Sequence, residues 1–578
     1  MAIETRERPR VSEDPQREPQ LGAHLVLQAL VREGVEVIFG YPGGAILPVY
    51  DALPYYPIHH VLVRHEQSAA FAADGYARAT GKVGVCMATS GPGATNLVTG
   101  IANAMMDSIP IVAITGQVPQ SVIGMDAFQE TDITGITLPI TKYNMVIRSV
   151  DEIGPAIQKA FYLARTGRPG PVLIDIPKDV QLAKGFLAPR QELNLPGYRP
   201  TIVPHRRQIR RAAELIRQAK RPLILAGHGI IISGATEELV RFAERTQIPV
   251  GLTLLGISGF PASHPLCLGM VGMHGHAHAN RAIHEADLII GIGMRFDDRV
   301  TGRPSEFAPN AKIIHIDIDP AEIGKVLKTE VPVVGDAREA LRLLLEELEP
   351  LEHDDWISQI RSWYRPIRTE PSGPDGVLQP QYVIARLHAL TEGKAIVTTD
   401  VGQHQMWTAQ LYRCDIPKQW ISSGGLGAMG FGVPSAMGAA IGRPDAEVWA
   451  VVGDGGVQMT LNEFATIVDE QLNVKVAIIN NGYLGMVRQW QQLFHNRNYS
   501  ETPISSPDYV LLGQAYRMPA RRVTRPGEVD EAIQWARSFR GPALIEFVVN
   551  QEENVYPMIP SGGSFRDMID DTQVEGEW

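Results

Sequence analysis

Short β-rich runs alternate with stretches of helical composition along most of this chain. The first block contains the runs VEVIFG, HHVLVRHE, GKVGVCMATS, IPIVAITG and PGPVLIDIP. This alternation predicts parallel sheets with helices on both faces, because a helical crossover must return the chain before each new strand. The pattern restarts twice, with RPLILAG and ADLIIGIG in a second block and EVWAVVGDG and VKVAIINN in a third. We therefore expect an α/β fold of three doubly wound parallel-sheet domains.

Two weakly periodic stretches, both predicted to be linkers, separate the blocks. Residues 186–205 are rich in proline, and residues 350–376 end in TEPSGPDG. The predicted organisation is a disordered arm at 1–20, domains at 21–185, 206–349 and 377–556, and a C-terminal tail at 557–578.

Charge and cysteine content exclude several classes of protein. The 578 residues carry 53 Lys and Arg against 64 Asp and Glu, spread along the chain, which argues against a nucleic-acid partner. Cys86, Cys267 and Cys414 form no CxxC pair, so a disulfide framework and a zinc site are not indicated, and a cytoplasmic protein is expected. The charged N-terminus lacks the apolar core of a secretory signal, and the uncharged stretch 424–442 is too rich in glycine to span a membrane.

The most informative motif is GDGG at 453–456, which follows the apolar run EVWAVV. A helical segment and the run VKVAIIN come next, and then Asn480, Asn481 and Gly482. A right-handed crossover would place Asp454 and Asn481 at the carboxyl ends of neighbouring parallel strands, where open α/β sheets bind ligands. Their oxygens suit Mg²⁺ that is shared with a diphosphate, although each motif alone is more simply a turn.

The GDG and NN pair resembles the signature of thiamine diphosphate enzymes. The resemblance implies that Asp454, Asn481 and the backbone carbonyl of Tyr483 hold the metal. It implies that coenzyme contacts are made by Gly43, Gly44, Glu66, Gln403, His404, Gly427, Ala428, Met429, Asp454, Gly455, Gly456, Asn481, Gly482, Tyr483, Leu484, Gly485 and Met486.

The coenzyme must also be activated, and this requires a carboxylate at N1′ of its pyrimidine ring. Glu66 opens the predicted helix EQSAAFAADGYARATG. A lone Glu in this place is more simply a surface carboxylate favoured by the helix dipole. The segments GYPGGA and TSGPGATN match family segments around the pyrimidine site, so Glu66 is the candidate partner of N1′.

Further strings resemble the FAD-containing acetolactate synthases, above all RFDDRVTG and GMVRQWQ. The resemblance implies FAD contacts by Arg168, Gly229, Thr253, Leu254, Met273, His274, Gly293, Met294, Arg295, Phe296, Asp297, Asp317, Ile318 and Asp336. It implies that Ser108, Phe128, Gln129, Lys142, Lys178, Arg299, Trp490 and Ser561 contact the substrate, and that Glu66, Gln129, Lys178, Arg299 and Trp490 are catalytic.

The reaction implied is decarboxylation of pyruvate and transfer of its hydroxyethyl unit to a second 2-keto acid. This would give 2-acetolactate from pyruvate, or 2-aceto-2-hydroxybutyrate from 2-ketobutyrate, in branched-chain amino-acid biosynthesis. A homodimer or homotetramer with a small regulatory subunit is also implied. The alternatives are a pyruvate oxidase, in which the flavin takes the electrons, and a homologue that binds cofactors without catalysis.

Two further motifs admit other interpretations. The histidines of HGHAH, His274, His276 and His278, could form a zinc site, but no carboxylate or cysteine completes the set. GGLGAMG matches the dinucleotide fingerprint GxGxxG and leaves a nicotinamide oxidoreductase as a further alternative. We expect this match to be accidental, because no well-formed strand of a βαβ unit is expected before it.

Overall fold

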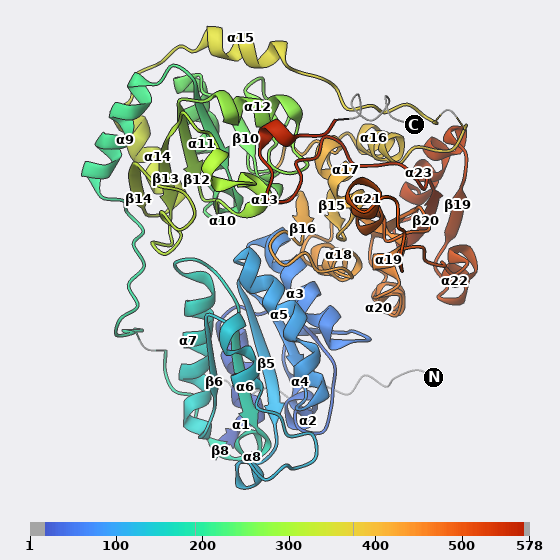
Figure 1. Cartoon of the computed structure of the whole chain (residues 1–578). Coiled ribbons are helices and arrows are strands. Elements are labelled where there is room, and N and C mark those ends of the chain that lie inside the picture. Colours follow the sequence, from blue (N-terminus) through green and yellow to red (C-terminus); the bar gives the residue numbers. More distant parts are fainter. Residues whose placement is uncertain (1–17, 191, 374, 571–578) are drawn as a thin grey trace. The chain divides into compact units, whose positions relative to one another are not determined.

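The computed structural model describes residues 18–190, 192–373 and 375–570 (Figure 1). Most of the predicted arm and residues 571–578 of the predicted tail lie outside the described part. Gln20, the last residue of the predicted arm, is not part of an arm. It belongs to strand β1, Gln20–Leu21, which pairs antiparallel with β8, Lys184–Gly185. The prediction of three parallel-sheet α/β domains is confirmed, since the described residues form three six-stranded sheets whose ladders are all parallel.

The first sheet has the strand order β3-β2-β4-β5-β7-β6. Its strands are β2 Val37–Gly40, β3 His59–Leu62, β4 Gly84–Ala88, β5 Ile111–Gln117, β6 Tyr143–Val146 and β7 Val172–Pro177. The residues of β4, β5 and β7 are all buried, as expected of parallel strands that are covered by helices on both faces.

Helix α3, Glu66–Thr80, follows β3 and ends at Gly81, whose positive φ of 80° closes the helix. A run of alanines and Gly75 allows helix α18, Gly432–Gly442, to pack closely against α3. A Cβ added to Gly75 would lie 2.2 Å from the Ser435 carbonyl oxygen, so a larger residue would push the two helices apart. The tight packing fixes the position of α3, and with it the residue at which α3 begins.

The middle sheet has the order β11-β10-β9-β12-β13-β14. Its strands are β9 Pro222–Ala226, β10 Val250–Leu252, β11 Cys267–Met270, β12 Leu288–Ile292, β13 Lys312–Asp317 and β14 Val331–Val334. The chain reverses its direction of travel across the sheet between β9 and β12. This order is that of dinucleotide-binding folds, which bind their ligand at such a switch point.

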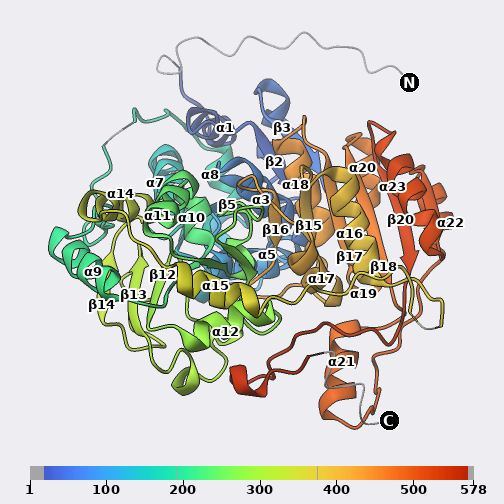
Figure 2. The ribbon, with the colours of Figure 1, turned by 90° about the horizontal axis from the view of Figure 1, so that it is seen from above.

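The third sheet has the order β16-β15-β17-β18-β20-β19, and Figure 2 shows β15, β17, β18 and β20 in succession. Its strands are β15 Ile396–Thr399, β16 Trp420–Ser422, β17 Val448–Gly453, β18 Val474–Asn480, β19 Ala520–Val523 and β20 Ala543–Val548. The expectation that no well-formed strand precedes GGLGAMG was wrong, because β16 precedes this motif and α18 follows it. That strand lies at the sheet edge, away from the switch point between β15 and β17.

The two predicted linkers differ. The described residues of 186–205 contain no helix or strand, whereas 350–376 contains helix α15, Asp354–Ser362. This helix is anchored by Trp356, whose indole nitrogen donates a hydrogen bond to the Pro222 carbonyl oxygen at 3.0 Å. The exact domain limits remain predictions.

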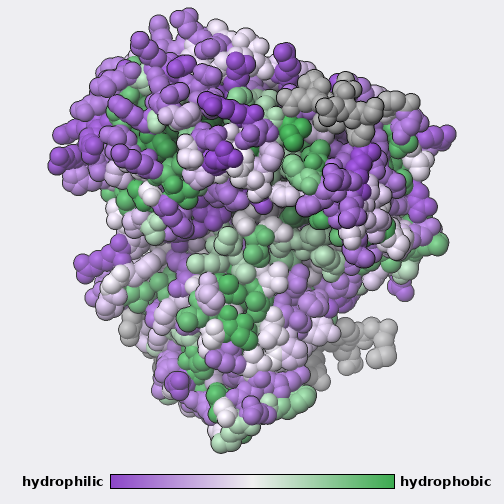
Figure 3. All heavy atoms as spheres, in the orientation of Figure 1, coloured by the Kyte–Doolittle hydropathy of each residue, from purple (hydrophilic) through white to green (hydrophobic). Residues whose placement is uncertain are grey.

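The chain divides into two compact units, each of which is described by itself. One contains residues up to 198 together with 425–445 and 460–472, and the other contains 199–424, 446–459 and 473 onward. The drawn face of the surface mixes polar and apolar side chains (Figure 3). Among the described residues, no helix is long and apolar enough to cross a membrane.

Candidate active site

The two predicted metal-binding side chains follow adjacent strands. Asp454 comes directly after β17 and Asn481 directly after β18, and Gly453 pairs with Ile479 in the parallel ladder between these strands. The backbone N–H of Gly482 donates to Asp454 Oδ2 at 3.1 Å. The predicted arrangement of strand, GDGG, helix, strand and NN is therefore present, and both oxygen-bearing side chains lie at the same edge of the sheet.

The environment of Asp454 is well suited to a cation. Burial raises the pKa of its carboxyl group to about 7, against the opposing effect of hydrogen bonds from the Gly482 backbone and the Ser506 hydroxyl. A bound Mg²⁺ would favour the ionised carboxylate and offset this cost of burial. Small residues are required nearby, since a Cβ added to Gly456 would lie 1.7 Å from an oxygen of Asp400.

Gln403 and His404 begin helix α17, Gln403–Leu411, just after β15. Asn481 Nδ2 donates to Gln403 Oε1 at 3.0 Å, so the predicted metal ligand and the predicted diphosphate contact touch each other. His404 Nε2 is buried and has no hydrogen-bond partner among the described residues. Burial lowers the pKa of this imidazole to about 3, so the ring is neutral. A buried polar atom of this kind calls for a partner, and a diphosphate oxygen fits.

Helix α21, Gly485–Phe494, extends the same site. A Cβ added to Gly485 would lie 2.3 Å from Gln403 Oε1, which explains the glycine at the start of the helix. The predicted contacts Gly482, Tyr483, Leu484 and Met486 lie on the turn and first residues that follow β18. Apart from Gly427, Ala428 and Met429, which follow β16, the residues assigned to metal, diphosphate and coenzyme in this domain come from the carboxyl ends of β15, β17 and β18, and they fit Mg²⁺ and a diphosphate.

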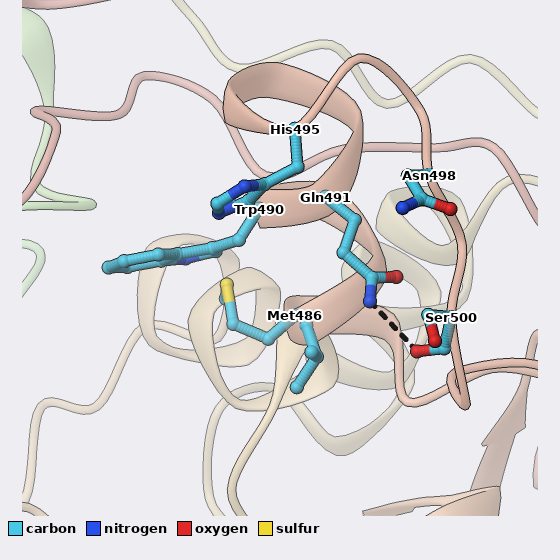
Figure 4. A pocket seen from close by; sticks show the side chains of 7 residues that line it. Met486, Trp490, Gln491, His495, Asn498 and Ser500 are labelled. Atoms are coloured by element: carbon cyan, nitrogen blue, oxygen red, sulfur yellow. Dashed lines mark hydrogen bonds between the residues drawn. The ribbon is translucent and has the colours of Figure 1, made fainter.

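A pocket of about 510 Å³ lies along α21 (Figure 4). Its lining residues are Met486, Val487, Trp490, Gln491, His495, Asn498 and Ser500. Trp490 forms an apolar wall and meets Phe494 edge to face, with ring centroids 5.9 Å apart. Gln491 is held away from the wall by its hydrogen bond to the Ser500 carbonyl oxygen at 2.9 Å. The pocket thus joins a predicted substrate residue, Trp490, to a predicted coenzyme residue, Met486.

Glu66 lies at the carboxyl end of the first sheet, in the other unit. It is the first residue of α3, is only 9% exposed, and accepts a hydrogen bond from Asn96 Nδ2 at 2.9 Å. A Cβ added to Gly93 would lie 3.3 Å from Glu66 Oε1, so the GPG turn also packs on the carboxylate. Asn96 stands in the quoted TSGPGATN segment, but the sequence does not reveal that its amide holds Glu66.

Gly43 and Gly44, which precede Glu66 in the sequence, lie at the same carboxyl edge of the first sheet. A Cβ added to Gly43 would lie 2.5 Å from the Thr89 side chain, and the Ala45 N–H donates to Thr89 Oγ1 at 3.2 Å. Gly44, by contrast, faces open space. Segments 40–45 and 89–96 therefore converge with Glu66 at the ends of β2, β3 and β4.

Three predicted substrate residues lie on segments that follow strands of the first sheet. Gln129 has a positive φ of 60° and lies on the turn at Gly91, and its neighbour Phe128 is 89% exposed. Lys178 is the first residue of α8, Lys178–Leu182, directly after β7. The loop that carries Phe128 and Gln129 is tied to the sheet by Gln117, whose Nε2 donates to the Thr131 carbonyl oxygen at 2.8 Å.

The side chain of Lys142 is bound to neighbouring parts of its own domain. Its ammonium group donates to the carbonyl oxygens of Leu163 and Thr166 and to the Tyr198 hydroxyl. These acceptors include the end of helix α7, Ile153–Arg165, where a cation is favoured by the helix dipole. The ammonium group of Lys142 is therefore engaged within its own domain, and the predicted substrate contact is not supported.

Two other predicted contacts of the first domain meet each other. Arg168 Nε donates to Ser108 Oγ at 2.9 Å, and Ser108 ends helix α5, Val98–Asp107, with a positive φ of 61°. The sequence assigned Arg168 to FAD and Ser108 to the substrate. Their hydrogen bond places both predicted contacts at one point of this unit.

A buried ionic cluster holds the segment that carries Gly427, Ala428 and Met429. Asp107 Oδ1 accepts a hydrogen bond from the Gly425 N–H at 2.6 Å, and its Oδ2 pairs with Arg78 at 2.8 Å. Arg78 also pairs with Asp74 on the same helix α3. The cluster was not predicted, because charged residues this far apart in sequence give no local signal.

The predicted FAD residues of the middle domain follow all six of its strands. They are Gly229 after β9, Thr253 and Leu254 after β10, Met273 and His274 after β11, Gly293, Met294, Arg295, Phe296 and Asp297 after β12, Asp317 and Ile318 at the end of β13, and Asp336 after β14. A Cβ added to Gly229 would lie 2.6 Å from the Gly293 Cα, so two backbones approach closely at the switch point. Such a glycine-lined edge fits a dinucleotide.

The side chains near this edge include two helix caps and three histidines. Asp297 and Asp336 accept backbone N–H bonds as N-caps of helices α13, Asp298–Thr301, and α14, Ala337–Glu347. His274 Nδ1 is buried and has no hydrogen-bond partner among the described residues. His276 and His278 have ring centroids 5.6 Å apart, and no group of three or more metal-binding side chains was found in the described part of the chain.

Arg299 and Ser561 are both exposed and lie on segments in contact. Arg299 Nη1 approaches Met273 Sδ at 3.8 Å, and the Met273 carbonyl oxygen accepts the Ile559 N–H at 2.8 Å. The Gly563 carbonyl oxygen accepts the Arg303 N–H at 2.8 Å. The described tail therefore packs on the loop that presents Arg299, with its guanidinium more than half exposed.

Three sequence-family models match the chain. A "Thiamine pyrophosphate enzyme, N-terminal TPP binding domain" matches residues 21–136, the central domain matches 209–344, and the C-terminal TPP binding domain matches 400–547. The fold and the residues at the sheet edges thus define a thiamine pyrophosphate enzyme.

Curated relatives narrow the class. An "Acetolactate synthase large subunit" of Corynebacterium glutamicum is 50% identical over 566 residues, covering 95% of this chain and 90% of the relative. An "Acetolactate synthase" of Mycobacterium bovis is 50% identical over 559 residues, with 94% and 90% covered. A "Probable acetolactate synthase large subunit" of Methanocaldococcus jannaschii is 49% identical over 568 residues, with 96% of both covered. The chain belongs to the family of acetolactate synthase large subunits.

Proposed function

We propose that this chain decarboxylates pyruvate and joins the remaining two-carbon unit to a second 2-keto acid. The product is 2-acetolactate when the second substrate is pyruvate, and 2-aceto-2-hydroxybutyrate when it is 2-ketobutyrate. The observation that carries the proposal is the placement of Asp454 and Asn481 on adjacent strand ends, beside Gln403 and the unpartnered buried nitrogen of His404. This edge is suited to Mg²⁺ and a diphosphate, which is what a thiamine enzyme must hold.

Thiamine diphosphate, when bound, supplies an electron sink for the decarboxylation of a 2-keto acid. We assign Asp454, Asn481 and the Tyr483 carbonyl oxygen to Mg²⁺, because the ion takes oxygen ligands and shares its site with phosphates. His404 and Gln403 hold the diphosphate. The buried surroundings of Asp454 limit water at this end of the site and strengthen its electrostatic interactions.

Glu66 holds the proton at N1′ of the pyrimidine ring. Its role is supported by burial, by the hydrogen bond from Asn96, and by its place at the start of a helix that α18 packs against tightly. A buried carboxyl group with a fixed hydrogen-bond partner is held in a defined orientation, as a positioned general acid or base must be. Asn96 keeps one carboxylate oxygen in place and leaves the other toward the GPG turn.

Arg299 and Trp490 are assigned to the second substrate. The exposed guanidinium of Arg299 can hold a carboxylate with two hydrogen bonds, and the ring of Trp490 offers a wall for the alkyl group. Gln129, Phe128, Lys178, Ser108 and Ser561 complete the proposed substrate contacts. One methylene on an apolar wall is worth only ~1 to 3 kcal/mol, so a preference for 2-ketobutyrate would be moderate.

FAD is assigned to the carboxyl edge of the middle sheet, where it would not take part in the net reaction. The glycine-lined switch point between β9 and β12 supports this assignment. We further propose a cytoplasmic homo-oligomer that binds a small regulatory subunit, in line with the wording "large subunit" of the relatives. The proposals on localisation, oligomer and regulatory subunit rest on the family, and they are independent of the metal site, as is the assignment of FAD.

The experiment is an assay of the purified full chain with pyruvate, thiamine diphosphate, Mg²⁺ and FAD. We expect acetolactate to form with release of one carbon dioxide per product molecule, and without consumption of oxygen or of an added quinone. Electron-acceptor consumption that matches pyruvate loss would identify a pyruvate oxidase instead. Absence of turnover with all three cofactors bound would favour the homologue that binds cofactors without catalysis.

A further inference from the structure

The backbone just before Glu66 is held by a buried carboxylate from a distant part of the chain. The N–H of Arg64 donates to both oxygens of Glu463, at 3.0 and 3.2 Å. Glu463 begins helix α20, Glu463–Asp469, and is fully buried. Arg64 and Glu66 are separated only by His65, the N-cap of α3, so this contact fixes the chain where it turns from β3 into the helix.

The carboxylate itself is held rigidly. Thr466 Oγ1 donates to Glu463 Oε2 at 2.8 Å, and Asn462 Nδ2 donates to Oε1 at 3.0 Å. Thr466 Oγ1 also lies 3.3 Å from the Leu62 carbonyl oxygen, at the end of β3. Helix α20 therefore contacts the backbone at the end of β3 and again within the turn that leads to α3, and burying a carboxylate there without such donors would be costly.

A second carboxylate on α20 makes an instructive contrast. Asp469 pairs with the guanidinium of the same Arg64, but its side chain is 66% exposed. Exposed ion pairs contribute little to stability, since solvent screens them and both side chains lose freedom. Of the two contacts that α20 makes with Arg64, only the one through Glu463 constrains the backbone that leads to Glu66.

We propose that Glu463 is a positioning residue for Glu66. It touches neither coenzyme nor substrate, and acts by fixing the first turn of α3 so that the Glu66 carboxylate stays at N1′. The inference rests on the proposed function of Glu66. Glu463 lies in the sequence between Asp454 and Asn481, so the segment that supplies the metal ligands also supplies the group that orients the activating carboxylate.

The decisive variant is Glu463→Gln, with Asp469→Asn as the matched control on the same helix. Glutamine keeps the size, but it leaves the Arg64 N–H a single acceptor oxygen and places an NH₂ group where the Asn462 amide or the Thr466 hydroxyl needs an acceptor. We expect E463Q to lower kcat by about 10- to 100-fold, the scale of loss that follows a small misplacement of a reacting group. The KM for pyruvate and the half-saturating concentration of thiamine diphosphate should change less than about threefold. D469N should match the parent chain in all three.

A measurement on the cofactor-free chain tests directly whether Glu463 holds the backbone that leads into α3. Hydrogen exchange of the cofactor-free chain, followed by mass spectrometry, should show faster exchange in the peptide that spans residues 62–68 of E463Q. The same peptide of D469N should exchange at the parent rate. Equal exchange in E463Q and D469N would overturn the proposal, because the backbone would then not depend on Glu463.

A double-variant cycle separates positioning from a general loss of stability. If Glu463 acts only through Glu66, adding E463Q to E66A should leave the residual rate unchanged. A further loss of the same size as in the parent background would overturn the proposal. If E463Q does not fold, Thr466→Val, which removes one donor to the carboxylate, should show a smaller loss of kcat that likewise vanishes in the E66A background.

Failure of the inference and failure of the proposed function give different results. A parent chain that makes no acetolactate removes the proposed function. A parent chain that makes acetolactate, together with an E463Q variant that behaves like D469N, removes only the role of Glu463.

Discussion

The first and third sheets share one strand order and carry different side chains at their carboxyl ends. Numbered by appearance in each domain, both follow the order 2-1-3-4-6-5. After its second strand the first sheet presents the buried carboxylate Glu66, whereas the third sheet presents Asp454 and Asn481 after its third and fourth strands. A common topology thus fixes the edge at which ligands bind, while the loops decide whether that edge holds a proton or a metal.

The largest expected effect is the loss of turnover when Glu66, the buried carboxylate of the first sheet, is removed. Glu66→Ala should lower turnover by about 10²- to 10⁴-fold, because proton transfer at N1′ loses its partner. Binding of FAD and of thiamine diphosphate with Mg²⁺ should stay nearly intact. Steady-state kinetics and cofactor titrations measure both quantities, with Glu36→Ala as a surface control. Unchanged turnover would remove Glu66 from the mechanism.

Removing a proposed metal ligand from the third sheet should weaken Mg²⁺ binding, whereas removing Glu66 from the first sheet should leave it nearly intact. Asp454→Ala removes a proposed metal ligand, so the half-saturating Mg²⁺ concentration should rise by more than the roughly 10- to 100-fold loss seen when only an outer partner of a ligand is removed. FAD affinity should not change. Titration calorimetry of Mg²⁺ and thiamine diphosphate checks this, with the exposed Glu531→Gln as control. Parent-like affinity would show that the metal binds elsewhere.

A smaller effect should follow from loosening the support of Asn481. Gln489 is fully buried, accepts a hydrogen bond from Gln403 Nε2 at 3.0 Å, and pairs with both backbone groups of Val555. Gln489→Leu should raise the half-saturating Mg²⁺ concentration by about tenfold, since Gln403 would lose its orientation toward Asn481. The exposed Gln514→Leu serves as control. A tenfold rise in both variants would point to a non-specific effect.

The smallest effect concerns a buried acid of the first sheet. Burial raises the pKa of Asp175 to about 7, against the opposing hydrogen bonds from Thr115 and Gln117. The folded chain therefore keeps this proton at pH values where the unfolded chain has lost it, and the stabilisation is lost as the pH rises through about 7.

This pH dependence can be measured by thermal unfolding. Between pH 5 and 8 the melting temperature of the parent chain should fall relative to that of Asp175→Asn, by roughly 1 to 3 °C. The asparagine variant has no proton to lose at this site. Parallel pH profiles for the two chains would mean that Asp175 is ionised throughout.

The sequence predicted the elements of the fold well, because each is encoded locally. Apolar runs predicted the strands β17 and β18, and GDGG with NN predicted the residues that follow them. The start of α3 at Glu66 was also predicted, and the structure confirms it. Errors arose where local patterns are weak, as at the short strands β1 and β16 and at helix α15 inside a predicted linker.

The partners of the predicted site residues could not be predicted in this way. Asn96 holds Glu66, Gln403 holds Asn481, and Asp107 holds the Gly425 backbone, yet each pair is far apart in sequence. The environment of Lys142 shows the same limit, since the resemblance implied a substrate contact, whereas the structure directs its ammonium group to backbone carbonyl oxygens at the end of α7.

The sequence by itself determined the α/β class, the three domains and the identity of the chemical groups, since periodicity and short motifs are properties of neighbouring residues. The tertiary structure decided which strands lie side by side, and hence which buried polar atoms meet. Glu463 is an example. The sequence indicates only that it is a carboxylate on a helix, and its hydrogen bond with the Arg64 backbone forms because packing brings α20 to the end of β3. Long-range hydrogen bonds depend on the order of the strands, which no local pattern contains.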